Sequence, residues 1–285
     1  MNCLRHLSRA LSLTLPFPTA SVLAASCWRD TPCSFVAEAA FPGPWDTDIY
    51  APASRNISPK SILSLATGEE ISSYPGLPKL SMNGSSAVFD FGLVVGGIIT
   101  LRYIVFGNGE GAVGLAFTEA KDYIGQRSDD SNGSQRGPDL AIYSNFTGPG
   151  EVKYVMPDNK LRGGFRYLTV FLVARAAQEL IEDVSLEIGF QPTWSNLRAY
   201  QGYFHSDDER LNKIWYAGAY TLQTNAVPVN RGRTVPFLTT GWENDGKLGP
   251  GDTIIVDGAK RDRAVWPGDM GVAVPASFVS IGDLA

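Results

Sequence analysis

The chain has 285 residues and a formal net charge of -5, and 19% of its residues are charged. This is the composition of an ordinary globular protein with room for one large or two medium domains, and it argues against nucleic acid or an anionic membrane surface as the partner. The 30 glycines and 18 prolines favour many turns and therefore a β-rich body with long loops.

Residues 1–25 have the pattern of a secretory signal peptide. Arg5 and Arg9 form a basic start, residues 11–23 are mostly apolar, and residues 22–25 offer a small-residue cleavage site. A buried or disordered N-terminus is the alternative. The apolar run is shorter than the ~20 residues that a spanning helix needs, so we expect no membrane anchor and a secreted, extracellular protein.

Export would place the remaining cysteines in an oxidising compartment. Cys3 lies within the expected signal peptide, and Cys27 and Cys33 are close enough in sequence to close a small disulfide loop. Two free thiols are the alternative.

Asparagine sequons are consistent with an exported glycoprotein. We predict glycosylation at Asn83, Asn132 and Asn145. A fourth sequon, at Asn56, is followed directly by Pro59 and is the least convincing.

Histidine is too scarce for several kinds of site. Cleavage of the signal peptide removes His6 and leaves His205. A multi-histidine zinc or iron site is then excluded, and a Ser-His-Asp triad would depend on His205 without any Gly-x-Ser-x-Gly elbow. We therefore expect no metal and no cofactor, and carboxylates remain the candidates for acid–base chemistry.

Strand patterns dominate the middle of the chain. Residues 26–78 are rich in Pro, Ser and Ala and predict an irregular segment with at most an edge strand at 61–65. Residues 87–95 and 98–106 are β-branched and aromatic, and Gly96-Gly97 between them predicts a hairpin turn.

Further strands are expected at 112–118, 152–156, 167–173 and 184–190. Because no helical crossover separates them, we predict an antiparallel β-sandwich over residues 79–200. The loop at 128–138 carries carboxylates in no specific calcium-binding pattern, and we expect it to be solvated.

The hydrophobic period changes after residue 205. Ser206 and Glu209 form a capping-box pattern, which predicts one helix of about five turns ending near Ala226. Its expected core-facing residues are Leu211, Ile214, Trp215 and Leu222. Residues 227–256 form a long irregular loop of the kind that serves a site, and residues 270–284 predict a second helix that Pro275 would kink.

Residues 257–269, the acidic stretch, concentrate carboxylates, cations and a tryptophan: Asp257, Lys260, Arg261, Asp262, Arg263, Trp266 and Asp269. Glycosidic cleavage needs a carboxylic acid for the leaving oxygen and a carboxylate for the other face of the sugar. Arginines keep some carboxylates ionised, an apolar pocket raises the pKa of another, and the Trp266 ring can pack against a sugar. On chemistry alone a solvated charged loop is the stronger alternative.

The acidic stretch, Asp-Gly-Ala-Lys-Arg-Asp-Arg-Ala-Val-Trp-Pro-Gly-Asp, resembles the Asp-x-x-x-Arg-Asp/Glu-Arg…Trp-x-Gly-Asp motif of the α-L-rhamnosidases of glycoside hydrolase family 78, particularly their secreted fungal branch. Residues 160–169 and 211–216 are similar to the entry to a sandwich strand and to the first barrel helix of that branch. The resemblance covers most of the chain after Phe89.

The resemblance implies a carbohydrate-binding-like β-sandwich followed by an (α/α)6 barrel of the six-hairpin type. It also implies inverting hydrolysis of terminal α-L-rhamnosides without a metal. Carried over by position, Asp262 would be the general acid, Asp257 and Asp269 would hold rhamnose hydroxyls, Trp266 would line the pocket and Arg261 would orient the carboxylates. Many family members have Glu at the position of Asp262.

The general base of the family comes from a later part of the barrel, and residues 201–285 are too few for six helix pairs. We therefore expect the start of a truncated barrel, inactive alone, from a longer enzyme that takes a rhamnosylated glycan or glycoside. A non-catalytic carbohydrate-binding β-sandwich protein is the main alternative, and a related (α/α)6 enzyme acting on another sugar is a further one.

Overall fold

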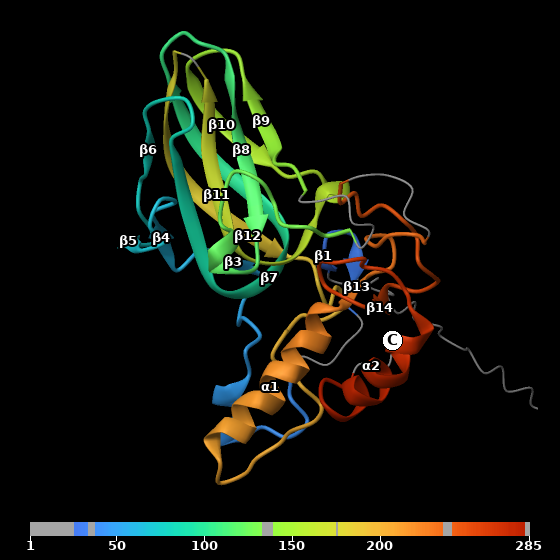
Figure 1. Ribbon diagram of the computed structural model, residues 1–285. Helices are drawn as coiled ribbons and strands as arrows, with labels where there is room; N and C mark the ends of the chain where they lie inside the picture. Colours follow the sequence, from blue (N-terminus) through green and yellow to red (C-terminus); the bar gives the residue numbers. More distant parts are fainter. Residues whose placement is uncertain (1–25, 34–37, 133–138, 175, 236–240, 283–285) are drawn as a thin grey trace, which may run out of the picture.

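The computed structural model describes residues 26–33, 38–132, 139–174, 176–235 and 241–282, so the expected signal peptide lies outside the described residues. An elongated β-sheet body adjoins two α-helices that lie side by side (Figure 1). The helical segments are η1 (Pro44–Asp48), η2 (Lys121–Tyr123), η3 (Asp158–Lys160), α1 (Glu209–Thr224) and α2 (Pro267–Val279). The strands are β1 (Ser26–Trp28), β2 (Thr31–Pro32), β3 (Asn56–Ile57), β4 (Ser61–Leu63), β5 (Glu70–Ser73), β6 (Lys79–Leu80), β7 (Ser86–Phe106), β8 (Gly111–Thr118), β9 (Ile142–Phe146), β10 (Gly150–Val155), β11 (Arg162–Ala174), β12 (Gln178–Ile188), β13 (Ala226–Pro228) and β14 (Thr253–Ile255).

Strand β7 organises the sheet. Ten strands join in one sheet with the order β3-β12-β7-β11-β8-β9, and β4 and β10 also pair with β7. Every pairing among the named strands is antiparallel. The antiparallel, sheet-rich part of the predicted fold class is therefore confirmed, and the described chain adds two α-helices to it.

The predicted hairpin at Gly96-Gly97 is wrong, because β7 runs through both glycines as one strand of 21 residues. Its first part pairs with β11 and its second part with β12. A Cβ on Gly97 would meet the carbonyl oxygen of Glu187, and one on Gly96 would lie 3.0 Å from Cα of Gly163. The glycines here permit close backbone approach where β7 changes partners, which is the other common use of glycine in a strand.

A single apolar core connects the sheet with the region that follows it. The Phe165 ring packs edge-on against Phe91 and Phe117, with ring centroids 5.7 and 4.9 Å apart. Trp194 and Tyr216 of the following region belong to the same buried cluster and are 0% exposed. We call residues 56–188 the sheet region and residues 189–282 the C-terminal region.

Helix α1 begins at a different cap from the predicted one. Asp208 is the N-cap, and its carboxylate accepts from the amides of Arg210 and Leu211. The hydroxyl of Ser206 donates instead to the Asp208 carbonyl and to the Asn212 side chain.

The core-facing side of α1 also differs from the prediction. Leu211 and Ile214 are 49% and 67% exposed, whereas Tyr216, Ala219 and Tyr220 are buried. Of the predicted core residues, Trp215 and Leu222 are partly buried and pack against the core, so the prediction is right for these two and wrong for Leu211 and Ile214.

The N-terminal segment supplies short strands to the sheet edge. β4 pairs with both β5 and β7, in place of the single expected edge strand. Cys27 and Cys33 are joined by a disulfide. No helix among the described residues is long and apolar enough to cross a bilayer.

The three predicted glycosylation sites differ in exposure. Asn83 lies in an exposed turn before β7, and Asn145 is exposed on the edge strand β9. Asn132 is only 5% exposed, and its burial argues against a glycan at that position.

Candidate functional site

The acidic stretch connects β14 to α2 and is closed on itself by Asp257. The Asp257 amide donates to the carbonyl of Ala264, and the Ala264 amide donates to Oδ1 of Asp257, both at 2.9 Å. These two hydrogen bonds fix one oxygen of the Asp257 carboxylate and make residues 257–264 a defined loop.

Two residues of this loop have a left-handed backbone. Asp262 and Arg263 have φ of 57° and 52°, a conformation that non-glycine residues seldom adopt and that clusters at functional sites. The Asp262 amide donates to the carbonyl of Ser131 at 3.0 Å, which attaches this turn to the loop after β8. The Asp262 side chain is 18% exposed.

Arg263, which we expected beside the carboxylates as one of the arginines that keep them ionised, instead donates to backbone carbonyls. Its Nε donates to the carbonyl of Arg231 and its Nη1 to the carbonyl of Ala259, both at 2.7 Å. Burial, aided by the nearby charge of Arg233, lowers the pKa of Arg263 to about 9. Arg261, which we expected to orient the carboxylates, has an exposed side chain, and its Nε lies 4.0 Å from Oδ1 of Asp262.

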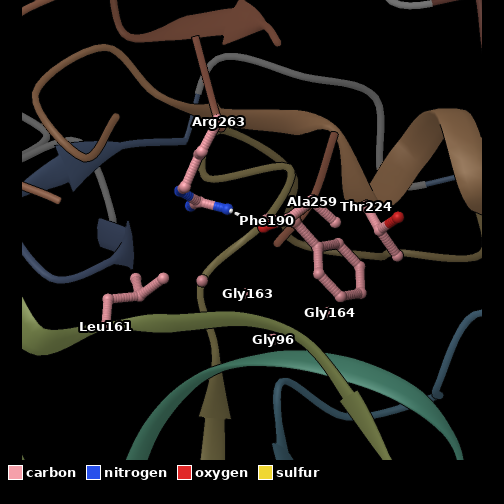
Figure 2. A pocket seen from close by; sticks show the side chains of 9 residues that line it. Gly96, Leu161, Gly163, Gly164, Phe190, Thr224, Ala259 and Arg263 are labelled. Carbon is pink, nitrogen blue, oxygen red and sulfur yellow. Dashed lines mark hydrogen bonds between the residues drawn. The ribbon is translucent and has the colours of Figure 1, made fainter. Parts of the chain in front are cut away.

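The loop rests directly on two glycines of β11. Figure 2 shows Arg263 and Ala259 beside Gly163 and Gly164 around a small cavity. A Cβ on Gly163 would meet the Ala259 carbonyl, and one on Gly164 would lie 2.7 Å from Cβ of Lys260. The cavity volume of about 10 Å³ admits at most one water, so this contact is structural.

Asp257 is influenced by the two other carboxylates of the acidic stretch. Burial raises the pKa of Asp257, and the charges of Asp262 and Asp269 raise it further, against the opposing hydrogen bonds from the amides of Ala264 and Gly258. A raised carboxyl pKa is what a proton donor needs near neutral pH. The structure thus brings Asp257, Asp262 and Asp269 within electrostatic range.

A pocket opens at Asp257. It has a volume of about 320 Å³ and lies between the end of α1, β7 and the acidic stretch. Its lining residues are Val94, Glu119, Tyr220, Thr221, Thr224, Asn225, Asp257, Gly258, Ala259, Lys260 and Arg261. This volume is at the lower end of the range for small-molecule sites.

Asp262, Trp266 and Asp269 do not line this pocket. Trp266 is partly buried at the N-cap of α2, and Asp269 is exposed in its first helical turn. Among the described residues, no three His, Cys, Asp or Glu side chains converge as they would around a metal ion.

The described part of the loop at 128–138, residues 128–132, is not solvated as we predicted, and residues 133–138 lie outside the described residues. Ser128 and Ser131 are 0% and 1% exposed. The nearby Asp139 is also buried, and its Oδ2 accepts from the Ser131 hydroxyl at 2.5 Å and from Nη1 of Arg162 at 2.6 Å. A run of Asp, Ser and Asn is equally typical of solvated loops, so composition carried no signal of this burial.

Arg233 connects the same network to the acidic stretch. Its Nη1 and Nη2 donate to the carbonyl and hydroxyl of Ser131, both at 2.7 Å. Its amide donates to the carbonyl of Arg263 at 2.9 Å. The long loop between α1 and the acidic stretch therefore serves the site by supporting it, since Arg233 fixes the same serine that accepts from Asp262.

Comparison with known proteins gives similarity of fold. No family model and no curated protein matches the chain. A rhamnosidase from Klebsiella oxytoca, solved with rhamnose bound, is similar over 83% of this chain and 43% of its own, with a TM-score of 0.53 and 17% identity. A glycoside hydrolase family 78 rhamnosidase from Bacillus sp. GL1 is similar over 73% of this chain and 18% of its own, with a TM-score of 0.50 and 17% identity.

The chain thus spans less than half the length of either rhamnosidase. At 17% identity the likeness is one of backbone architecture. The described chain has a fold similar to part of two rhamnosidases, and it places Asp257, a carboxyl group with a raised pKa, in the lining of a pocket.

Proposed function

We propose that this chain is the acid-bearing part of an inverting glycosidase that acts on terminal α-L-rhamnosides. The observation that carries the proposal is that Asp257 lines a pocket and that burial and the charges of Asp262 and Asp269 raise its pKa. Its support is the motif of the acidic stretch together with the fold similarity to two rhamnosidases.

In this proposal Asp262 protonates the glycosidic oxygen as the leaving group departs. Asp257 and Asp269 accept hydrogen bonds from hydroxyls of the terminal sugar, Trp266 offers an apolar face, and Arg261 orients the carboxylates. The raised pKa of Asp257 makes it the competing proton donor. In a longer enzyme that also supplies the base, activity that survives in Asp257→Asn and is lost in Asp262→Asn would support the assignment of Asp262 as the acid.

Inverting hydrolysis also needs a carboxylate base that activates water on the opposite face of the sugar. We assign that role to none of the carboxylates in this chain. We propose further that the sheet region is a carbohydrate-binding-like sandwich and that α1 and α2 belong to an (α/α)6 barrel.

Export is part of the same proposal. The disulfide between Cys27 and Cys33 is consistent with an oxidising compartment, and the exposed Asn83 and Asn145 are accessible to glycosylation.

The test measures the binding of methyl α-L-rhamnoside and of methyl α-D-glucoside to the 285-residue chain by saturation-transfer NMR. We expect the rhamnoside to bind more tightly. Asp257→Asn should weaken rhamnoside binding about 10-fold or more, because it removes a charged hydrogen-bond acceptor. Asp252→Asn, an exposed carboxylate outside the acidic stretch, should bind like the wild type.

Equal binding of the two sugars, or unchanged binding in Asp257→Asn, would refute the proposal. The same chain should not hydrolyse nitrophenyl α-L-rhamnoside. Turnover would show that one of its own carboxylates supplies the base.

A further inference from the structure

A second groove lies beside the pocket at Asp257 and has about twice its volume, about 640 Å³ against about 320 Å³. One wall is the loop that follows β8, between Glu119 and Asp130, and the other is formed by Lys260 and Arg261 of the acidic stretch. The sheet region and the candidate catalytic loop therefore build this groove together.

The groove and the pocket are neighbours. Glu119, Lys260 and Arg261 line both of them. Nζ of Lys260 donates to Glu119 at 2.7 Å and to Asp129 at 3.0 Å. These contacts hold the largely buried Lys260 side chain in place between the groove and the pocket. A molecule whose end ring lies at Asp257 would pass Lys260 and Arg261 to reach the groove.

The wall that the sheet region contributes is held in place. The Asp129 amide donates to the Phe117 carbonyl at 3.0 Å, and the Phe117 amide donates to the Ser128 hydroxyl at 3.1 Å. The Gln126 side-chain amide donates to the Gly84 carbonyl at 3.0 Å. A groove with such a wall needs little ordering when it binds a ligand, which favours affinity.

The chemistry of the groove suits a sugar ring. Tyr123 is 72% exposed, so its ring is free to pack against an apolar ring face while its hydroxyl stays in water. The Asp129 carboxylate is already engaged by Arg162 and Lys260. The exposed guanidinium groups of Arg127 and Arg261 line the groove and can donate to ligand hydroxyls.

We propose that this groove holds the leaving-group sugar of the substrate, with its ring against Tyr123 and its hydroxyls accepting from Arg127 and Arg261. The inference rests on the proposed function, which places the terminal sugar in the pocket at Asp257. It assigns a part of substrate recognition to the sheet region, through a loop that carries no residue of the acidic stretch.

The experiment compares two ligands on the intact 285-residue chain, methyl α-L-rhamnoside and a rhamnosyl-glucose disaccharide, by titration calorimetry and saturation-transfer NMR. The variants are Tyr123→Ala and, as a matched control, Tyr143→Ala. Tyr143 is 50% exposed on β9 and does not line the groove. The stacking contribution of one tyrosine predicts a disaccharide affinity about 2- to 10-fold above that of the monosaccharide.

Tyr123→Ala should remove this gain and the saturation transfer to the glucose ring, and leave monosaccharide binding unchanged. Tyr143→Ala should change neither. The inference is overturned if the disaccharide gains nothing over the monosaccharide, or if Tyr123→Ala keeps the gain.

Failure of the proposed function has a different signature. In that case Asp257→Asn leaves monosaccharide binding unchanged, whatever Tyr123→Ala does to the disaccharide. A chain that binds neither sugar overturns both.

Discussion

The sheet region and the C-terminal region meet at residues 259–263, and they satisfy their buried backbone in different ways. In the sheet region, strand ladders pair the backbone and apolar side chains fill the interior. In the C-terminal region, Arg263 donates to the carbonyls of Arg231 and Ala259, and Arg233 donates across the junction to the carbonyl of Ser131, all outside the strand ladders. Buried carbonyls need a donor, and a guanidinium supplies several in a fixed geometry.

Buried charge differs between the junction and the interior of the sheet region. Facing the C-terminal region, Arg162 is paired with Asp129 and Asp139. Deeper inside the sheet region, Glu179 is 0% exposed and neither of its carboxylate oxygens has a hydrogen-bond partner among the described residues. Ion pairs therefore stabilise the junction, whereas Glu179 is buried without one.

The most severe test of this difference is Arg162→Met. The substitution leaves the carboxylate of Asp139, whose side chain is 3% exposed, without its cation, and we expect a loss of about 3–5 kcal/mol in the free energy of unfolding. Urea denaturation measures it. Arg166→Met is the control on the same strand, because its ion pair with Asp90 is 38% exposed on the arginine side and should contribute about 1 kcal/mol or less. Equal losses of unfolding free energy in Arg162→Met and Arg166→Met would contradict this difference between the two ion pairs.

Glu179→Gln tests the interior of the sheet region. Burial raises the pKa of Glu179 to about 8, so folding favours its protonated form. Stability is then complete below the unfolded pKa of about 4.5 and falls by up to about 1.4 kcal/mol per pH unit until pH passes about 8.

The Gln variant should lack this slope when urea midpoints are measured from pH 4 to 9. Tyr103 interacts electrostatically with Glu179, and Tyr154 with Tyr103; burial raises the pKa of both tyrosines, so neither ionises between pH 4 and 9. Glu182→Gln, a partly exposed group on the same strand, should keep the slope. A wild type without any slope would mean that Glu179 ionises as freely as an exposed carboxyl.

Asp208→Ala tests whether the caps of the C-terminal region matter as much as its arginines. Loss of the N-cap of α1 should cost about 1 kcal/mol. Ser206→Ala, at the position where the sequence pattern predicted the cap, should cost less. The reverse order in thermal unfolding would restore the original prediction.

The smallest expected effect concerns the left-handed turn of the acidic stretch. At Asp262, with φ of 57°, Gly should be more stable than Ala by roughly 1 kcal/mol. At Asp269, inside α2, the order should reverse, because Gly costs about 0.5–1 kcal/mol relative to Ala in a helix. The same order at both positions in urea denaturation would be inconsistent with the left-handed turn.

Periodicity predicted much of the fold and failed at particular residues. The strands at 112–118 and 167–173 are confirmed within β8 and β11, because β-branched and aromatic runs have few other uses. Gly96-Gly97 was misread because a turn and a close strand contact both require glycine.

All the predicted catalytic and substrate-binding residues lie within the acidic stretch, and their roles remain predictions. What supports that stretch comes from far along the chain, through Ser131, Arg162 and Arg233. Such long-range partners leave no local pattern, since a buried arginine and an exposed one look alike in sequence.

Gly163 and Gly164, the two glycines on which the acidic stretch packs and which we call the glycine seat, have a consequence for protein engineering. Any side chain there would collide with the backbone or side chains of residues 259–260, so the seat will accept almost no other residue in a mutational library. The exposed rim around Tyr123 carries no such constraint. A library for a new substrate preference should therefore randomise the exposed residues around Tyr123. Substitutions at Gly163 and Gly164 will mostly give variants that do not fold.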